Sequence, residues 1–321
     1  RMNELTLKDI QRAAERIRTH AHYTPVLRSE SINQLAGNDL FCKGEHLQKV
    51  GAFKFRGAFN AVSQLSREEL DQGLITVSSG NHAQALALAG QLFRSKVYIV
   101  MPETASYIKK EAVKSYGATI YSCGNVQHQR EKALIDFQIK TGAYYIHPFD
   151  HPHIIEGQGT VALELLNQVA DLDVLVAPVG GGGLLAGIAL CAKSMSPGIQ
   201  VYGAEPLGAD DAARSLASGE RQPQLDPQTI ADGLQTGLGE LNWSIIKQSV
   251  DRIVTVREDE ILHATRFVWE RMKQLVEPSG AVALAAVFSE EFRALHQGQR
   301  VGLVFSGGNV NSDFFQNQNQ S

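Results

Sequence analysis

The sequence predicts an α/β protein built on two open, doubly wound, mostly parallel sheets, with a large domain and a smaller, mobile lobe. Short β-branched runs alternate with longer helical stretches, a pattern typical of parallel strands joined by crossover helices. The strand runs are mostly apolar, as expected for strands buried on both faces. The chain has 321 residues, of which 43% are hydrophobic, enough for two lobes with substantial cores.

The elements follow in order along the chain. An amphipathic helix is expected over residues 7–20, because Ile10, Ala13 and Ile17 recur at helical spacing. The strand-forming runs cover residues 74–77, 96–100, 173–176, 200–205 and 301–305. We place the smaller lobe at residues 74–148 and the large domain at residues 1–73 and 149–321. The segment 148–153, rich in proline and histidine, is expected to form the hinge.

Composition excludes several classes of function. The net charge is −4 and no run of Lys or Arg occurs, so we expect no nucleic-acid partner. Cys42, Cys123 and Cys191 are far apart in the sequence, which indicates neither a disulfide framework nor a thiolate zinc site. No apolar run reaches membrane-spanning length and the first residues contain no apolar leader. We therefore expect a cytoplasmic protein without a membrane partner.

A lysine between two aromatic residues is the first candidate for chemistry. Lys54 lies between Phe53 and Phe55 in the glycine-bounded segment 51–58. Crowding by apolar groups removes water from an ammonium, lowers its pKa and populates a neutral amine that can attack a carbonyl. The alternative is that Lys54 extends into solvent from a helix start while the aromatic side chains anchor that helix.

Four consecutive glycines form the second candidate. They follow a predicted strand and precede a helix, which leaves backbone N–H groups accessible to a phosphate; they are Gly180, Gly181, Gly182 and Gly183. The spacing Gly181-x-Gly183-x-x-Ala186, with Glu205 ending the next strand, also satisfies a dinucleotide-binding pattern. A nicotinamide-dependent dehydrogenase and a non-catalytic sensor of a phosphate-containing ligand therefore stay open as alternatives.

Together the motifs resemble the fold-type-II pyridoxal phosphate (PLP) enzymes. Besides the two segments above, the resemblance rests on Ser78-Ser79-Gly80-Asn81-His82 and on residues 157–160, 204–206, 277–280 and 306–309. It is closest to the serine racemase and β-hydroxyamino-acid dehydratase branch, because threonine dehydratases usually have alanine where this chain has Ser79. The resemblance implies the tryptophan synthase β-like fold with its two sheets.

The resemblance also implies how the cofactor is held. Lys54 would bind PLP covalently, and the amides of Gly180 to Gly183 would bind its phosphate. Asn81 would hydrogen-bond the ring hydroxyl, with Phe53 and Gly233 beside the ring. Ser306 would meet the pyridine nitrogen. A neutral hydroxyl cannot hold a proton there as a carboxylate does, so the ring is a weaker electron sink, which suits rapid β-elimination.

Ser79 is the second catalytic residue implied by the resemblance. It would face the substrate α-carbon from the side opposite Lys54, which permits proton exchange on two faces and hence racemisation. The backbone N–H groups of Ser78, Ser79, Gly80, Asn81 and His82 would hold the substrate carboxylate. The alternative is that Ser79 caps the helix that begins near Asn81.

A divalent cation site is implied at the end of the strand at residues 200–205. Its ligands would be Glu205, the carbonyl of Ala209 and Asp211, a set of hard oxygens suited to Mg²⁺, Mn²⁺ or Ca²⁺. The alternative is that these acidic residues cap a helix and interact with its dipole.

Arg130 is a candidate for substrate recognition. In relatives a matching arginine meets a carboxylate on the β side of the substrate, which would favour 3-hydroxyaspartate. The alternative is a solvated helix face with i,i+4 pairing around Arg130. One departure from the family is Ala52, where many relatives have serine. The chain ends shortly after Ser306, so we expect no regulatory domain of the biosynthetic threonine dehydratase type.

These expectations combine into one predicted activity. The protein is expected to dehydrate and deaminate β-hydroxy-α-amino acids, with L-serine, L-threonine and threo-3-hydroxyaspartate as candidate substrates, giving a 2-oxo acid and ammonia. Serine racemisation is expected as a second outcome. The implied cofactors are PLP and a divalent cation, and a homodimer is expected.

Overall fold

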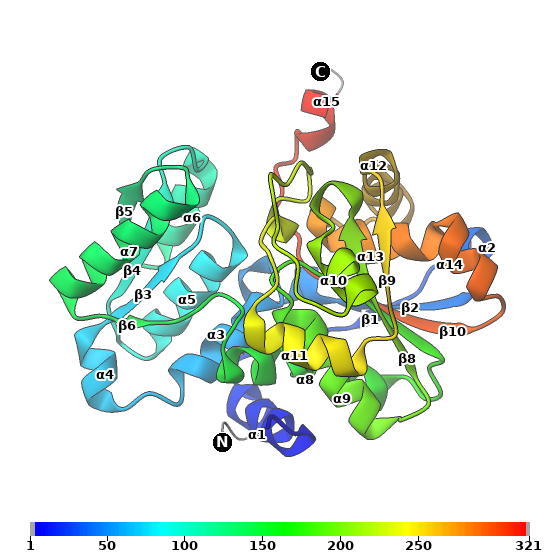
Figure 1. The fold of residues 1–321 in the computed structure, drawn as a ribbon, viewed down its shortest axis with the longest axis horizontal. Coiled ribbons are helices and arrows are strands. Elements are labelled where there is room, and N and C mark those ends of the chain that lie inside the picture. Colours follow the sequence, from blue (N-terminus) through cyan, green and yellow to red (C-terminus); the bar gives the residue numbers. More distant parts are fainter. Residues whose placement is uncertain (1–3, 319–321) are drawn as a thin grey trace.

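Two separate sheets organise the chain, and they lie on opposite sides of the molecule in Figure 1. The computed structural model describes residues 4–318. The larger sheet has six strands and the smaller sheet has four. All neighbouring strands are parallel except β1 and β2. The predicted α/β class with two mostly parallel sheets is confirmed.

The larger sheet is formed by the two ends of the described chain. Its strands, in spatial order, are β1 (Val26–Leu27), β2 (Asp39–Gly44), β10 (Arg300–Phe305), β7 (Val174–Pro178), β8 (Gln200–Pro206) and β9 (Arg252–Val256). The central strands are buried along most of their length, because helices cover both faces. Three of the predicted strand runs correspond to β7, β8 and β10.

The smaller sheet comes from one internal segment. Its spatial order is β5 (Thr119–Cys123), β4 (Val97–Pro102), β3 (Leu74–Val77) and β6 (Tyr144–Tyr145). The predicted run at residues 74–77 coincides with β3, and the run at residues 96–100 overlaps β4. All four strands lie inside the segment predicted as the smaller lobe; the domain boundaries at residues 74 and 148 themselves stay a prediction.

Fifteen α-helices in residues 4–318 cover the sheets. Those that precede or surround the smaller sheet are α1 (Leu7–Ile17), α2 (Glu30–Ala36), α3 (Lys54–Val62), α4 (Arg67–Gln72), α5 (Asn81–Leu92), α6 (Tyr107–Ser115) and α7 (Gln127–Thr141). The later ones are α8 (Pro152–Gln168), α9 (Gly183–Met195), α10 (Asp211–Ser218), α11 (Glu240–Ser249), α12 (Glu258–Phe267), α13 (Pro278–Phe288), α14 (Glu290–Leu295) and α15 (Phe314–Gln318).

Local sequence explains where several helices begin and end. Ser66 and Glu69 form a capping box at the start of α4, which satisfies two N–H groups that the helix leaves free. Pro152 opens α8, a position where its missing N–H costs nothing. Gly142 ends α7 with φ at 69°, a left-handed conformation that favours glycine.

The hydrophobic core joins α3 to the smaller sheet. Phe55 and Phe59 of α3 are buried in one cluster with Leu74 of β3, Leu86 of α5 and Ile99 of β4. We use the name smaller lobe for the four-stranded sheet with α5, α6 and α7. Because α3 packs against this lobe, the helix that begins at Lys54 lies at the junction of the two sheets.

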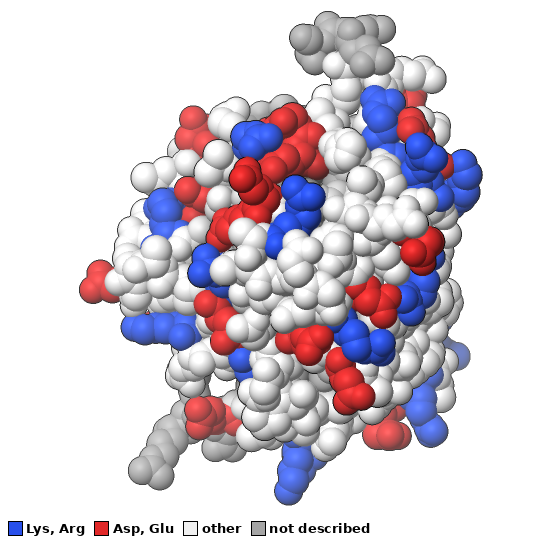
Figure 2. Space-filling view, turned by 90° about the vertical axis from the view of Figure 1, so that its right-hand side faces the viewer, with Lys and Arg blue, Asp and Glu red and all other residues white. Residues whose placement is uncertain are grey.

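The described part of the chain has mixed charge on the face displayed in Figure 2 and ends in a short helix. Among residues 4–318 no helix is long and apolar enough to cross a membrane. Figure 2 shows acidic and basic side chains interspersed on the face that it displays, without a continuous basic surface. Near the end of the chain, where the sequence is polar, residues 314–318 form the short helix α15.

Candidate functional site

Four loops with candidate residues follow the carboxyl ends of parallel strands. Ser78 follows β3, Gly180 follows β7, Glu205 lies near the end of β8 and Ser306 follows β10. In open α/β sheets ligands bind at these ends. The contacts of these residues with α3 and with one another define the candidate site.

Lys54 occupies the first position of α3 and is partly buried. Its Nζ donates a hydrogen bond to the carbonyl of Pro148 (3.0 Å) and lies 5.4 Å from the ring centre of Phe53 and 6.0 Å from that of Phe149. Burial lowers the pKa of Lys54 to about 8, because apolar neighbours replace water around the ammonium. The alternative of a solvent-extended lysine does not fit this environment.

The segment before Lys54 is tied to the end of β10. The N–H of Phe53 donates to the carbonyl of Ser306 (3.1 Å), and Ala52 pairs with Gly307 in an isolated antiparallel bridge. Ser306 is buried at 4% exposure. These contacts hold Phe53, Lys54 and Ser306 in one place, although 252 positions separate Lys54 from Ser306 in the sequence, 306 less 54.

The glycine loop between β7 and α9 is buried and closely packed. A Cβ on Gly181 would come within 2.3 Å of the Phe149 ring, and one on Gly180 within 3.1 Å of the Gly233 carbonyl. Gly182 has a φ of 95°, which also requires glycine. The N–H groups of Gly180, Gly181 and Gly182 donate no hydrogen bond within residues 4–318. Buried donors of this kind require an acceptor, which an anion such as phosphate supplies.

Phe149 connects this loop to Lys54. Its ring packs against Gly181 and faces the Lys54 ammonium, while the preceding carbonyl of Pro148 accepts the Lys54 hydrogen bond. His147 Nδ1 accepts from the N–H groups of Phe149 (3.1 Å) and Asp150 (2.8 Å). Burial lowers the pKa of His147 to about 4, and the Lys54 charge adds to this effect. A neutral His147 therefore stabilises the turn that carries Phe149.

The loop after β3 approaches the same lysine. Ser78 Oγ accepts from the N–H of Gly80 (3.2 Å), which shapes the turn into α5. His82 is buried, and both burial and the Lys54 charge lower its pKa well below the usual range. The hydroxyl of Ser79 makes no hydrogen bond with any described residue. The N-cap of α5 is Gly80 without a side-chain bond, so the capping alternative for Ser79 is wrong.

Asn81 lies where the two sheets meet. Its Nδ2 donates to Glu277 Oε1 (2.8 Å), and its Oδ1 accepts from Asn309 Nδ2 (2.8 Å). Burial raises the pKa of Glu277 to about 8, and the charge of Asp232 adds to this. Glu277 Oε2 also accepts from the N–H of Asn309 (2.9 Å). Asn81 of the smaller lobe is thus fixed by two residues of the C-terminal region.

Gly233 is the last of the residues predicted around the cofactor, and it lies against the glycine loop. It lies in the 3-10 helix η4 (Asp232–Leu234), and its N–H donates to Ser279 Oγ (3.0 Å). The structure therefore brings together Phe53, Lys54, Asn81, the glycine loop, Gly233 and Ser306.

Glu205 and Asp211 lie beside this group. Both are fully buried at 0% exposure. Burial raises both pKa values, and the charge of Asp211 adds to the shift of Glu205. Glu205 accepts from the N–H groups of Ala212 (3.1 Å) and Ala213 (2.9 Å), so it caps α10.

Asp211 and the nearby Ala209 have oxygen atoms that accept no hydrogen bond from the described residues. Asp211 Oδ1 is buried without a partner in residues 4–318, and the buried Ala209 carbonyl in the 3-10 helix η3 (Leu207–Ala209) accepts no hydrogen bond there. Asp211 Oδ2 accepts from the N–H of Leu238 (2.9 Å). Within the described chain no cluster of three or more His, Cys, Asp or Glu side chains is arranged for a metal ion. A cation here would therefore need carbonyl and water ligands besides the two carboxylates.

Arg130 lies apart from these contacts, on α7 of the smaller lobe. Burial raises the pKa of Cys123, at the end of β5, and the charge of the nearby Arg130 opposes that shift. Arg130 Nε is buried without a partner in the described chain, and no ion pair involves it there. The helix face around Arg130 has no fully buried residue and carries the i,i+4 contacts of the alternative, Gln127 with Glu131 (2.8 Å) and Lys132 with Asp136 (2.5 Å). The role of Arg130 in substrate recognition therefore stays a prediction.

Sequence reasoning missed several contacts at the site. Phe149, Glu277 and Asn309 each touch a predicted residue, yet no role was assigned to them. Glu277 and Asn309 lie in two of the motifs on which the family resemblance rests, so the sequence did point to them. For Phe149 the only signal in the sequence was Gly181, whose lack of a side chain leaves room for the ring but does not identify which residue fills it.

Comparisons with known proteins agree with this geometry. A family model described as "Pyridoxal-phosphate dependent enzyme" matches residues 17–307. The serine racemase of Dictyostelium discoideum is 49% identical over 96% of this chain and 96% of its own length. The structure of maize serine racemase is 42% identical with a TM-score of 0.94, covering 98% of this chain and 97% of that one. The processed threonine deaminase isoform 2 from Solanum lycopersicum is 35% identical with a TM-score of 0.91, covering 98% and 86% respectively.

Proposed function

Because this chain belongs to the family of pyridoxal-phosphate dependent enzymes, we propose that it converts β-hydroxy-α-amino acids to 2-oxo acids and ammonia and also racemises serine. The observation that carries the proposal is the half-buried Lys54, whose pKa is lowered to about 8, close to a glycine loop with unused N–H groups. The racemase and deaminase relatives support both outcomes. Because the chain belongs to this enzyme family, we no longer propose a nicotinamide-dependent dehydrogenase or a non-catalytic sensor of a phosphate-containing ligand.

The residues present fit PLP. Three buried N–H groups of the glycine loop are free to bind a phosphate, and Lys54 can supply the amine that holds an aldehyde. Asn81, Phe53, Gly233 and Ser306 surround the space where we place the ring. When bound, PLP withdraws electrons from the substrate α-carbon and so weakens its bond to hydrogen.

Lys54 and Ser79 would move the α-proton. We assign removal of the proton on one face to the neutral amine of Lys54, which is available because burial lowers its pKa to about 8. We assign the opposite face to Ser79, whose hydroxyl makes no hydrogen bond with residues 4–318. When Lys54 has removed the proton on its face, the Ser79 hydroxyl can donate its own proton on the other face, which inverts serine; in the reverse direction the deprotonated Ser79 oxygen accepts the proton and Lys54 returns one.

The loop from Ser78 to His82 would bind the substrate carboxylate through its unused N–H groups at the start of α5; the N–H groups of Ser78 and Gly80 already donate to the Val100 carbonyl and to Ser78 Oγ. A Cβ on Gly80 would meet no atom within 4 Å, so there is room for a ligand in front of the loop. Arg130 would recognise a β-carboxylate after closure of the smaller lobe. We further propose a homodimer and a cytosolic setting, which suits three free, buried cysteines.

One experiment tests the reaction. Turnover of both enantiomers of serine, threonine and 3-hydroxyaspartate is measured for the wild type, Lys54→Ala and Ser79→Ala, with the exposed Ser115→Ala as control. Lys54→Ala should lose both reactions by about a thousandfold or more, and Ser79→Ala should lose racemisation while elimination from one enantiomer survives. An active Lys54→Ala protein, or equal loss of both reactions in Ser79→Ala, would contradict the assignment.

The divalent cation is a separate proposal, with Glu205, the Ala209 carbonyl and Asp211 as ligands. It is supported by the partnerless Asp211 Oδ1 and by two buried carboxylates that burial makes costly to ionise. A cation there would fix the Leu238 backbone, whose side chain packs near Gly182.

Chelation tests the cation site. EDTA should lower the melting temperature, because a metal present at about 100 times its dissociation constant adds about 2.7 kcal/mol of stability. Asp211→Asn should remove the response to EDTA. Elemental analysis that finds no metal, together with indifference to EDTA, would leave helix capping as the role of this pair.

A further inference from the structure

A cavity of about 400 Å³ lies away from the site described above. Its walls come from α2, α12, α13 and α14, on the side of the larger sheet remote from the smaller lobe (Figure 1). None of the residues assigned to the cofactor, substrate or cation lines it. Its volume lies within the range of small-molecule sites.

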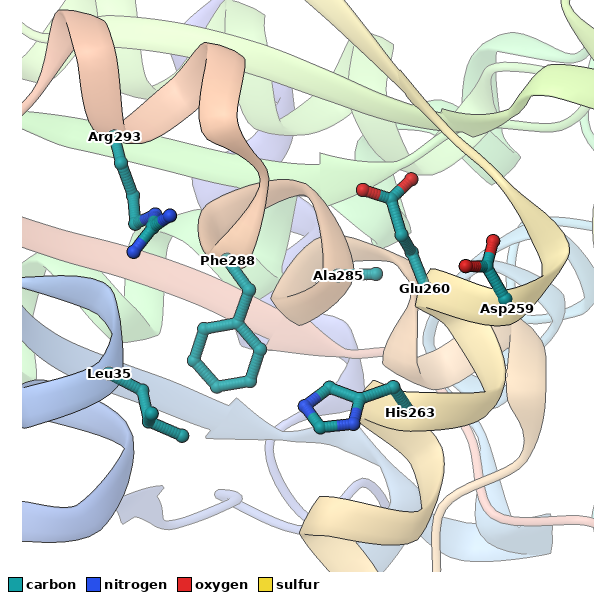
Figure 3. A pocket seen from close by; sticks show the side chains of 7 residues that line it. All are labelled: Leu35, Asp259, Glu260, His263, Ala285, Phe288 and Arg293. Atoms are coloured by element: carbon teal, nitrogen blue, oxygen red, sulfur yellow. The ribbon is translucent and has the colours of Figure 1, made fainter.

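The base of this cavity is apolar. Figure 3 shows the Phe288 ring between Leu35 and His263, with Ala285 on the His263 side. Leu35 is 48% exposed, although the other apolar residues of its helix, Ile32 and Ala36, are buried. The Phe288 ring lies 6.4 Å from the His263 ring, centre to centre. A flat or branched apolar group can therefore pack here against an aromatic face and a leucine.

The acidic side of the cavity is partly neutralised. Asp259 accepts two hydrogen bonds from the Arg257 guanidinium (3.0 and 3.1 Å), and Glu260 accepts from the backbone N–H of Arg257 (2.7 Å) at the start of α12. Arg257 therefore offsets one of the two negative charges on this side.

The basic side is free. The Arg293 guanidinium makes no ion pair or hydrogen bond with residues 4–318, and the His263 ring has aromatic contacts there but no hydrogen-bond partner. Figure 3 places Arg293 across the cavity from the two carboxylates, with Phe288 below them. The unused planar fork of an arginine matches a carboxylate.

We propose that this cavity binds a small monocarboxylate with an aromatic or branched apolar body. The carboxylate pairs with Arg293, His263 offers a ring N–H, and the body packs on Phe288 and Leu35.

Calorimetry with phenylacetate tests the proposal on the cofactor-loaded protein without substrate, so its outcome is independent of turnover. We expect saturable binding to the wild type. Arg293→Gln should weaken it by about tenfold or more, since a charge-assisted hydrogen bond contributes roughly 1.5–3 kcal/mol. Phe288→Ala should weaken it too. The matched control is Arg18→Gln at the C-cap of α1, an arginine whose side chain is 75% exposed, which should bind like the wild type.

Three results would overturn the proposal. The first is no saturable heat with phenylacetate. The second is equal affinity for phenylacetate in the wild type, Arg293→Gln and Phe288→Ala. Binding of that kind would take place at another site, for example at the loop from Ser78 to His82 that we propose for the substrate carboxylate. The third is tighter binding of phenethylamine, because a cation preference would assign the cavity to Asp259 and Glu260 instead.

Discussion

At the residue scale, the reactivity of Lys54 depends on how burial changes its pKa. The ammonium loses water and gains the carbonyl of Pro148 rather than a carboxylate, so burial lowers the pKa from 10.5 to about 8. At pH 7 about a tenth of such amines are neutral, against fewer than about one in a thousand for an ordinary lysine. The neutral fraction rises as the pH passes through 8.

A pH titration of labelling checks this shift. We expect trinitrobenzenesulfonate to label Lys54 of the cofactor-free protein at a half-maximal rate near pH 8, read by peptide mass mapping. Lys54→Met identifies which signal belongs to this lysine. A half-maximum near pH 10.5 would show that the amine is solvated and would remove the physical reason for its reactivity.

Individual site residues were predictable to different degrees. Lys54 and the four glycines stood out, because a lysine between aromatic residues and a run of glycines are rare and each has a direct physical reading. Phe149 did not, since its packing on Gly181 joins residues 32 positions apart, 181 less 149. Such a contact depends on how α8 and α9 pack, and no local pattern encodes it.

At the element scale, α3 is anchored by a buried ionic network. Arg56 is fully buried two residues after Lys54; its guanidinium binds both oxygens of Glu45 (2.5 and 2.8 Å) and both of Glu164 (2.7 and 2.8 Å). Lys43 Nζ also donates to Glu164 Oε2 (2.7 Å). The network connects α3 to β2 and α8, so it fixes the backbone that presents Lys54.

Breaking this network should destabilise the fold. Arg56→Met leaves the fully buried Glu45 without its partner, so we expect the free energy of unfolding to fall by about 3–5 kcal/mol in urea titrations. Adding Glu45→Leu should recover part of the loss, because the uncompensated charge is gone. Arg67→Met, which removes an exposed i,i+4 pair with Asp71, is the control and should change little. An Arg56→Met protein as stable as this control would contradict the argument.

The same network explains why one central strand was not predicted. β2 contains Lys43 within the run Asp39–Gly44, and a buried lysine interrupts the apolar pattern that marks such strands. Its charge is compensated by Glu164 on a distant helix, which the local sequence does not reveal. β1 and β6 have two residues each, too few for any periodicity.

At the scale of the whole molecule, polar contacts join the smaller lobe to the rest of the chain. Asn81 bonds to Glu277 and Asn309, and Lys109 of α6 forms an ion pair with Asp232 (2.6 Å). The Lys109–Asp232 partners are 123 positions apart, so sequence spacing could not reveal them. Asp232 precedes Gly233, which places this ion pair beside the expected cofactor. Closure of the lobe and access of water to the site should therefore depend on it.

The Lys109–Asp232 pair should affect turnover more than stability. Its side chains are 33% and 54% exposed, and exposed pairs contribute roughly 0.2–1 kcal/mol. We expect Lys109→Met to lower kcat by about 1.5- to 5-fold while the urea midpoint stays unchanged. Raised salt should slow the wild type in the same way, since screening weakens exposed pairs, and should have little further effect on the variant. Lys114→Met is the matched control, because its partner Glu111 lies on the same helix. Equal kcat for Lys109→Met and the wild type at low salt would show that lobe closure does not depend on this pair.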